Sequence, residues 1–102
     1  MKNKIINIYN LSKKIESFKK KGKKVILCHG VFDLLHLGHV KHFKEAKQNG
    51  DILIVTVTPD KFVNKGPNRP VFNAINRMEV ISSLEFVDYV AENKWSTAVE
   101  LI

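Results

Sequence analysis

Two histidines stand three residues apart in the segment GVFDLLHLGH, residues 30–39. The segment follows a short apolar run and leads into a helical pattern, so we expect His36 and His39 on one side of a first helical turn. Backbone N–H groups at a helix N-terminus bind anions, and Gly38 removes a side chain that would keep a ligand away from them. These residues predict a site for a polyphosphate whose negative charge grows during a reaction.

Two other interpretations of the histidines stay open from the residues alone. They can cap the helix and pack as ordinary polar side chains. They can also ligate zinc, because Cys28, His29 and His42 lie in the same stretch. Zinc needs three or four converging ligands, whereas a strand end, a helix start and the next helical turn do not obviously converge, so we expect no bound metal. Cys28, inside an apolar run, is expected to be a buried thiol and not a nucleophile.

The elements that must position these residues include several helices, read from apolar spacing and capping residues. They are expected at residues 8–18 with an end at Gly22, from His39 to Asn49 and Gly50, after a cap at Asn73, and after Ser96 or Thr97.

Three apolar runs predict strands at residues 25–30, 52–57 and 86–90. The second does not alternate with polar residues, which is typical of a parallel strand covered by helices on both faces. Alternating strands and helices predict an α/β fold, Rossmann-like, with three α/β/α layers and a parallel sheet. Ligands in such folds bind at the C-terminal ends of the strands.

The domain organisation is expected to be a helical segment at residues 1–22 and a domain at residues 23–102. Three strands are few for this fold, and the last helix stops after about one turn. We therefore expect the C-terminal part of the domain to be missing from the sequence.

Composition limits the class of protein. The chain has 102 residues, 44% of them hydrophobic, with one cysteine and a net charge of +7. It contains no apolar run near the ~20 residues of a membrane helix, and one cysteine fits a reducing cytoplasm. The lysine excess favours an anionic ligand. No aromatics interleave with the lysines between residues 13 and 24, so we expect a solvated helix face and no nucleic-acid partner.

The polar loop after the second strand carries further candidates. From spacing alone, Lys65 and Arg69 are exposed loop charges, and Asp60 lies near the expected crevice. Arg77 can form a surface ion pair, but residues two apart on a helix do not face each other. Glu79 is therefore a poor partner, and we expect Arg77 to contact a ligand.

GVFDLLHLGH resembles the HxGH signature of the cytidylyltransferase-like nucleotidyltransferases. The similarity extends from Lys23 onward and includes GDILIVTVTPD, the loop with Lys65 and the arginine of NRMEVISSLEFVDYV. It looks most like the sugar-phosphate branch, which contains the adenylyltransferase domain of ADP-heptose synthesis and glycerol-3-phosphate cytidylyltransferase. The stretch KGPNRPVFN followed by LEFVDYV is closer to the heptose type.

The resemblance implies an enzyme that transfers a nucleoside monophosphate from ATP, favoured over CTP, to a sugar phosphate or polyol phosphate. Pyrophosphate leaves, and no covalent enzyme intermediate forms. The implied catalytic residues are His36, His39 and Lys65. The implied nucleotide-binding residues are Gly30, Val31, Phe32, Asp33, Gly38 and Arg77. Phe32 would donate its backbone N–H to the α-phosphate, and Asp33 would organise the turn. Asp60 and Arg69 are assigned to the acceptor.

The resemblance also implies Mg²⁺ carried by the nucleoside triphosphate, a homodimer and a sugar-kinase-like partner. We expect the outer edge of the third strand to lie open unless a second chain covers it. Two residues depart from the family, Val31 in place of Thr, Ser or Cys and His29 in place of Asn or Thr. A glycerol-3-phosphate-type cytidylyltransferase is one alternative. Nucleotide binding without turnover is the other, because the later segment that closes over the triphosphate is not in the sequence.

Overall fold

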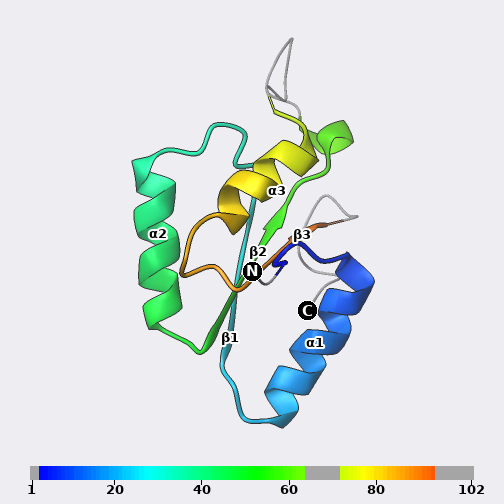
Figure 1. The fold of residues 1–102 in the computed structure, drawn as a ribbon, viewed down its shortest axis with the longest axis vertical. Coiled ribbons are helices and arrows are strands. Elements are labelled where there is room, and N and C mark those ends of the chain that lie inside the picture. The colour runs from blue at the N-terminus through cyan, green and yellow to red at the C-terminus, as the bar shows by residue number, and fades with distance from the viewer. Residues whose placement is uncertain (1–2, 64–71, 94–102) are drawn as a thin grey trace.

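The structure, a computed structural model, describes residues 3–63 and 72–93 (Figure 1). A three-stranded parallel sheet lies at its centre, in the order β1 (Val25–Gly30), β2 (Ile52–Val57) and β3 (Tyr89–Glu92). The register pairs Val25 with Ile52 and Gly30 with Val57. The first two strands are confirmed at their predicted bounds, and each is followed by a segment that leads into a helix.

The third strand begins three residues later than predicted. Phe86 and Val87 are apolar, but they belong to a turn after the preceding helix, in which the Val87 N–H donates to the Leu84 carbonyl at 3.2 Å. Val87 is fully buried and completes the core from this turn. Sheet pairing with β2 begins only at Tyr89. The apolar character of residues 86 and 87 therefore reflects burial in the core and not pairing in the sheet.

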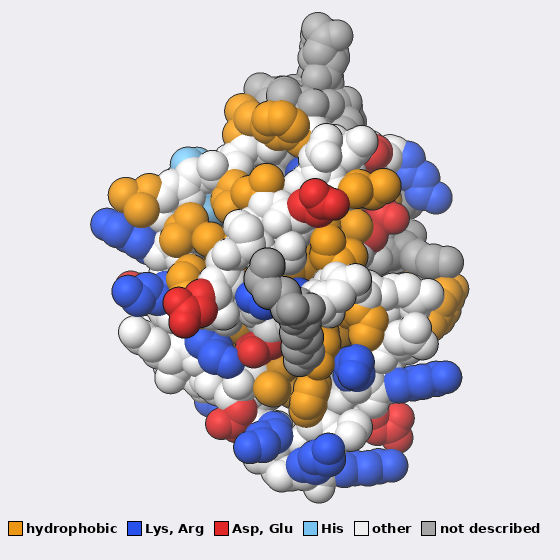
Figure 2. Space-filling view, in the orientation of Figure 1, with side chains coloured by type: hydrophobic (Ala, Val, Ile, Leu, Met, Phe, Trp, Pro, Cys, Tyr) orange, Lys and Arg blue, Asp and Glu red, His pale blue; other side chains and the backbone are white. Residues whose placement is uncertain are grey.

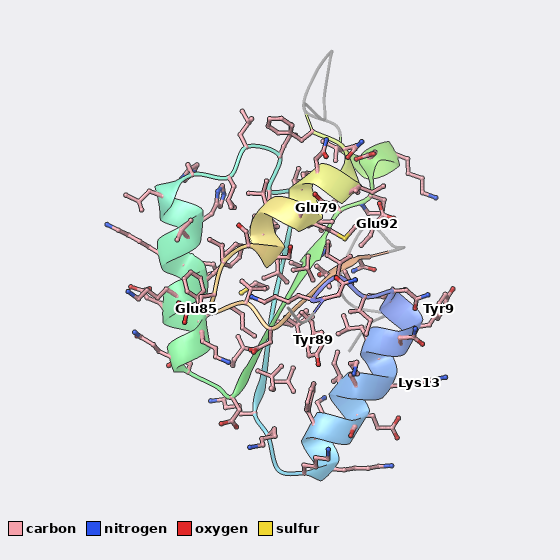
Figure 3. All side chains as sticks on the ribbon, in the orientation of Figure 1. Tyr9, Lys13, Glu79, Glu85, Tyr89 and Glu92 are labelled. Atoms are coloured by element: carbon pink, nitrogen blue, oxygen red, sulfur yellow. The ribbon has the colours of Figure 1, made fainter. Side chains whose placement is uncertain are left out.

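Helices cover both faces of the sheet, which confirms the predicted three layers. Ile8 and Leu11 of α1 (Ile8–Lys20) pack on one face, against Ile54 and Ala91. The other face is covered by α2 (Leu37–Gln48) and α3 (Ala74–Ser82). Phe43, Met78 and Ile81 from these helices meet the strand residues Leu53, Val55 and Val90. Figure 3 shows Tyr89 between the sheet and α1, with Tyr9 and Lys13 on the outer side of that helix.

Local capping residues set the helix bounds. The Asn7 and Asn73 side chains accept backbone N–H bonds at the starts of α1 and α3, which confirms the predicted cap at Asn73. Gly22 has a φ of 77°, the left-handed conformation predicted just past α1. A short 3₁₀ turn, η1 (Asp60–Phe62), follows β2. None of the helices in the described ranges combines the length and apolar composition needed to cross a membrane.

The outer edge of β3 is not open, which corrects the expectation from the sequence. Residues 4–6 run parallel to β3: the Val90 N–H donates to the Lys4 carbonyl and the Ile6 N–H to the Val90 carbonyl, both at 2.9 Å. Figure 1 shows this N-terminal stretch beside β3. Residues 4–6, which precede α1, therefore pair with the outer edge of β3. From the sequence, a second chain is expected at this edge.

Candidate active site

His36 and His39 together form the N-terminal cap of α2. The Gly38 N–H donates to Nδ1 of His36 at 3.0 Å, and the His36 N–H donates to Nδ1 of His39 at 3.2 Å. The two imidazole rings stack with centroids 4.0 Å apart and an interplanar angle of 33°. The expected pairing on one side of the first turn is therefore found, and the capping interpretation also holds, because both rings make cap hydrogen bonds.

The cap fixes which nitrogen of each ring carries the proton. A nitrogen that accepts an N–H bond needs its lone pair, so a neutral ring with Nδ1 as acceptor is protonated at Nε2. Both His36 and His39 then present an Nε2–H donor. Neither Nε2 has a hydrogen-bond partner within residues 3–63 and 72–93. This end of α2 thus offers two ring N–H donors beside a helix N-terminus.

The pKa of His39 supports the neutral form. Burial lowers the pKa of His39 below the ordinary histidine value, and a positive charge on His36 or His42 lowers it further. A proton added to His39 would sit on Nδ1 and break its bond from the His36 N–H. The neutral form of His39, with its proton on Nε2, is therefore favoured near neutral pH.

Two glycines in the segment are required by rings of the site itself. A Cβ at Gly38 would lie 2.8 Å from Cε1 of His36, and a Cβ at Gly30 would lie 2.7 Å from Cζ of Phe32. From the sequence, Gly38 is expected to make room for a ligand. The structure shows that it makes room first for the imidazole of His36, because the cap folds that ring back over the helix start.

The Phe32 side chain has a structural role that the sequence did not predict. Its φ of 49° is the left-handed conformation, uncommon for a residue with a side chain. This turns its ring onto Gly30, with the ring centroid 5.1 Å from that of Phe43 and 5.5 Å from that of His39 in edge-on contact. The phenyl ring thus anchors the turn in the core and supports the His39 imidazole. Local sequence patterns carry no signal for such a backbone conformation.

Asp33 is buried and joins the turn to a distant segment. Its Oδ1 accepts the Phe72 N–H at 2.9 Å, across 39 residues of sequence. This bond connects the turn to the start of α3, and the role of Asp33 in organising the turn stays a prediction.

Arg77 and Asp60 are placed differently from the expectation. The Arg77 side chain is 0% exposed, and Nη2 donates to Oδ1 of Asp60 at 2.6 Å. Nη1 donates to the Val31 carbonyl at 2.8 Å and Nε to the Phe72 carbonyl at 3.1 Å. The three donors of Arg77 thus contact the protein, because a buried guanidinium must find acceptors, and the nucleotide contact stays a prediction. Asp60, expected at the acceptor, uses one oxygen for this pair, and its side chain is 45% exposed.

The remaining two histidines contact other side chains. Nδ1 of His29 is 2.8 Å from Oγ1 of Thr56, and Nε2 of His42 is 3.9 Å from Sγ of Cys28. Burial raises the pKa of the Cys28 thiol, which opposes a nucleophilic role. Within the described part of the chain, no three His, Cys, Asp or Glu side chains group closely enough to hold a metal ion.

Two further features surround the site. A cavity of about 470 Å³ lies beside the turn, lined by Phe32, Asp33, Leu35, Phe72, Asn76 and Arg77 among others. Figure 2 shows lysine side chains gathered at the lower end of the molecule, around the end of α1 and the start of β1. This is the end of the sheet away from the histidine pair. Lys65 and Arg69 lie outside the described residues, as do Ser96 and Thr97.

Comparison with known proteins gives relatives that are named bifunctional protein HldE. The bifunctional protein HldE of a Nitratiruptor species is 46% identical over 85 residues, which cover 81% of this chain and 18% of that protein. The HldE protein of Geobacter metallireducens is 39% identical over 101 residues, covering 97% of this chain and 21% of that protein. The chain thus spans about a fifth of the length of these curated relatives.

A solved structure shares the fold, and a family model identifies the family. The crystal structure of the lipopolysaccharide core biosynthesis protein from Thermoplasma volcanium is 34% identical, with a TM-score of 0.67 over 78% of this chain and 69% of that chain. The model of the family described as cytidylyltransferase-like matches residues 27–102, which include the histidine pair, the Asp33 turn and Arg77. By this match, and as the HxGH segment predicts, the chain belongs to the cytidylyltransferase-like family.

Proposed function

We propose that this chain transfers a nucleoside monophosphate from a nucleoside triphosphate to a sugar phosphate or polyol phosphate. The observation that carries the proposal is the histidine pair at the N-terminus of α2, with Nδ1 of each ring held by the backbone. Both Nε2–H donors are thereby placed at the C-terminal end of β1 before any ligand arrives. Donors fixed in advance where negative charge develops are the main source of catalysis in such transfers.

The reaction is a single displacement at the α-phosphorus. An oxygen of the acceptor phosphate forms a bond to the α-phosphorus, and the bond from that phosphorus to the bridging oxygen of pyrophosphate breaks. The electron pair leaves with pyrophosphate, and no enzyme group becomes covalently attached. Charge grows on the α-phosphate oxygens, to which His36, His39 and the Phe32 N–H donate. Lys65 is assigned to neutralise the triphosphate or acceptor phosphate.

Mg²⁺ enters this proposal as part of the bound triphosphate. Of the carboxylates near the turn, one oxygen of Asp33 accepts the Phe72 N–H and one oxygen of Asp60 accepts from Arg77. So small a set of carboxylates fits Mg²⁺, because the ion keeps several waters and is held largely by phosphates. When bound, the ion would neutralise charge on the triphosphate.

The nucleotide and acceptor are proposed from the resemblance and from the relatives. KGPNRPVFN favours ATP over CTP and a heptose-type sugar phosphate as acceptor. The relatives are named as bifunctional, which supports a sugar-kinase-like partner activity, on a separate chain or a fused domain. The Thermoplasma volcanium protein is named for lipopolysaccharide core biosynthesis, which supports a product used in carbohydrate assembly. We place the reaction in the cytoplasm and the chain in a homodimer.

The test is pyrophosphate release by the full chain with MgATP or MgCTP, each with heptose 1-phosphate or glycerol 3-phosphate. We expect release with ATP and the heptose phosphate, and much less with the other pairs. Nucleotide binding should be measured on the same samples by calorimetry. Binding of ATP without release from any pair would overturn turnover and favour nucleotide binding alone. Release only with CTP and glycerol 3-phosphate would favour the polyol-phosphate cytidylyltransferase.

A further inference from the structure

Arg77 binds three segments of the chain that converge at the C-terminal end of the sheet. Its three donors reach the Val31 carbonyl in the turn after β1, Asp60 after β2 and the Phe72 carbonyl before α3. The guanidinium is fully buried, so these partners replace water around a charged group. The guanidinium carries its N–H donors on three nitrogens in a planar fork, so it spans acceptors on three segments, whereas an ammonium carries all its donors on one nitrogen.

The bond to Val31 has a consequence for the next residue. In a trans peptide the carbonyl of one residue and the N–H of the next point in opposite directions. Because Nη1 of Arg77 holds the Val31 carbonyl at 2.8 Å, the Phe32 N–H is directed away from the guanidinium. This N–H has no hydrogen-bond partner within the described residues, although Phe32 is half-buried. An oriented and unused donor of this kind is suited to an anion.

Phe72 is connected to the residues on both sides of Phe32, to Val31 through Arg77 and to Asp33 directly. The Phe72 carbonyl accepts from Nε of Arg77, and the Phe72 N–H donates to Asp33. The residue before Phe32 and the residue after it are therefore both connected to the backbone at the start of α3. This arrangement holds Phe32 in its left-handed conformation, at a φ of 49°, which free chains rarely adopt for a residue with a side chain.

We propose that Arg77, paired with Asp60, is a positioning residue that aims the Phe32 N–H at the α-phosphate of the nucleotide. The inference rests on the proposed function and extends it, because it assigns Arg77 to the donor and not to the ligand. Asp60 supplies the compensating charge at 2.6 Å and connects the segment after β2 to the same group. Substitution of Arg77 or Asp60 should therefore displace the Phe32 N–H, although neither side chain contacts that group.

The test compares Arg77→Lys and Asp60→Asn with the wild-type chain. Arg77→Lys keeps the charge but loses the bond to Val31, and we expect kcat to fall about 30-fold while the dissociation constant for MgATP rises less than about fivefold. The Phe32 amide signal in a ¹H–¹⁵N spectrum should shift in the nucleotide-free variant and respond less to added MgATP. Asp60→Asn keeps an oxygen that can accept from Arg77 but loses the negative charge. We therefore expect the same shift of the Phe32 amide signal and a smaller fall in kcat, about fivefold.

Controls separate positioning from stability and from acceptor binding. Ile81→Val shortens a buried side chain of the same helix and keeps the three hydrogen-bond partners of Arg77, so it should leave kcat and the Phe32 amide signal unchanged. A role of Asp60 at the acceptor would raise the KM for the sugar phosphate, whereas the positioning role leaves that KM unchanged and lowers kcat. If Arg77→Lys does not fold, Asp60→Asn decides by the same measurements.

The outcomes distinguish this inference from the proposed function. A folded Arg77→Lys variant with an unchanged Phe32 amide signal and kcat within twofold of wild type would overturn the positioning role. If the wild-type chain neither binds MgATP nor releases pyrophosphate, the proposed function is wrong. The assignment of the Phe32 N–H to an α-phosphate is then wrong as well. The shift of the Phe32 amide signal in the nucleotide-free protein would still test whether Arg77 holds the peptide.

Discussion

The His36 and His39 rings stack at a centroid distance of 4.0 Å, and each ring accepts a backbone N–H through Nδ1. The relationship joins the fold to the proposed chemistry, because the hydrogen bonds that start α2 also leave both Nε2–H groups as donors. A helix cap made of serine or aspartate would satisfy the same backbone groups but offer no such donors. Structural capping and catalysis can therefore be separated by substitution.

His36→Asn and His39→Gln are expected to retain the helix and lose activity. Asparagine is a good N-cap residue and glutamine at the third helical position reaches back to the cap, so each replaces the Nδ1 acceptor but not the Nε2–H donor. We expect kcat for pyrophosphate release to fall on the order of 100-fold in each, with a loss of stability below about 1 kcal/mol. His42→Ala, on the exposed side of the same helix, is the matched control and should stay within a few-fold of wild type. Equal losses in all three variants would contradict the assignment.

Gly38→Ala is expected to reduce activity more than stability. Its φ is not in the left-handed region, so alanine suits the helix, but the added Cβ would lie 2.8 Å from Cε1 of His36 and displace that ring. We expect kcat to fall about tenfold, since one fixed donor is lost in part. Gly22→Ala is the converse control: its φ of 77° opposes a side chain although nothing lies within 4 Å. That variant should lose roughly 1–2 kcal/mol of stability, by urea unfolding, and keep its kcat.

Stability should fall as the solution is acidified through the histidine range. Because burial and then the charges of His36 and His42 lower the pKa of His39, the unfolded chain takes up the proton at a higher pH than the folded one. The free energy of unfolding therefore decreases as pH drops below about 6.5, the ordinary histidine value, until the folded pKa is passed. Urea unfolding between pH 5 and 8 measures this dependence. His39→Gln should show a shallower slope, and an identical slope would contradict the origin in His39.

Residues 4–6 are expected to protect the edge of β3. Ile6→Pro removes the N–H that donates to the Val90 carbonyl at 2.9 Å, which should cost about 1–3 kcal/mol because that carbonyl loses its partner. The exposed edge should also promote association between chains, measured by light scattering across protein concentrations. Ile6→Val keeps the N–H and serves as the control. Concentration-independent behaviour of a folded Ile6→Pro variant would show that the edge needs no cover.

The strands and caps were predictable because their signals are local. An apolar run such as Ile52–Val57 requires burial on both faces, and Asn73 satisfies backbone groups within its own turn. Phe86 and Val87 misled the prediction of β3, because a buried turn residue has the same composition as a strand residue. Apolar composition alone does not distinguish a residue that is hydrogen-bonded in the sheet from one that is only packed in the core.

The candidate site was predictable in its histidines and not in its supports. The HxGH spacing places two rings on one turn, whereas the partners of Arg77 are two carbonyl groups and a carboxylate 17 residues away. A carbonyl has no signature in the sequence, since every residue carries one. The expectation of a ligand contact for Arg77 rested on its neighbours along the helix and on the resemblance to the family, and neither indicates which protein groups the guanidinium contacts. The left-handed φ of Phe32 is likewise set by tertiary packing on Gly30.

The measurement that tests the central claim most directly is a long-range ¹H–¹⁵N spectrum of the histidine rings near pH 7.5, with and without MgATP. We predict that His36 and His39 are both neutral and protonated at Nε2, because Nδ1 of each accepts a backbone N–H. Added MgATP should shift both Nε2–H signals and leave the ring signals of His42 nearly unchanged. Protonation at Nδ1 in either ring, or MgATP binding that moves neither Nε2–H signal, would contradict the account.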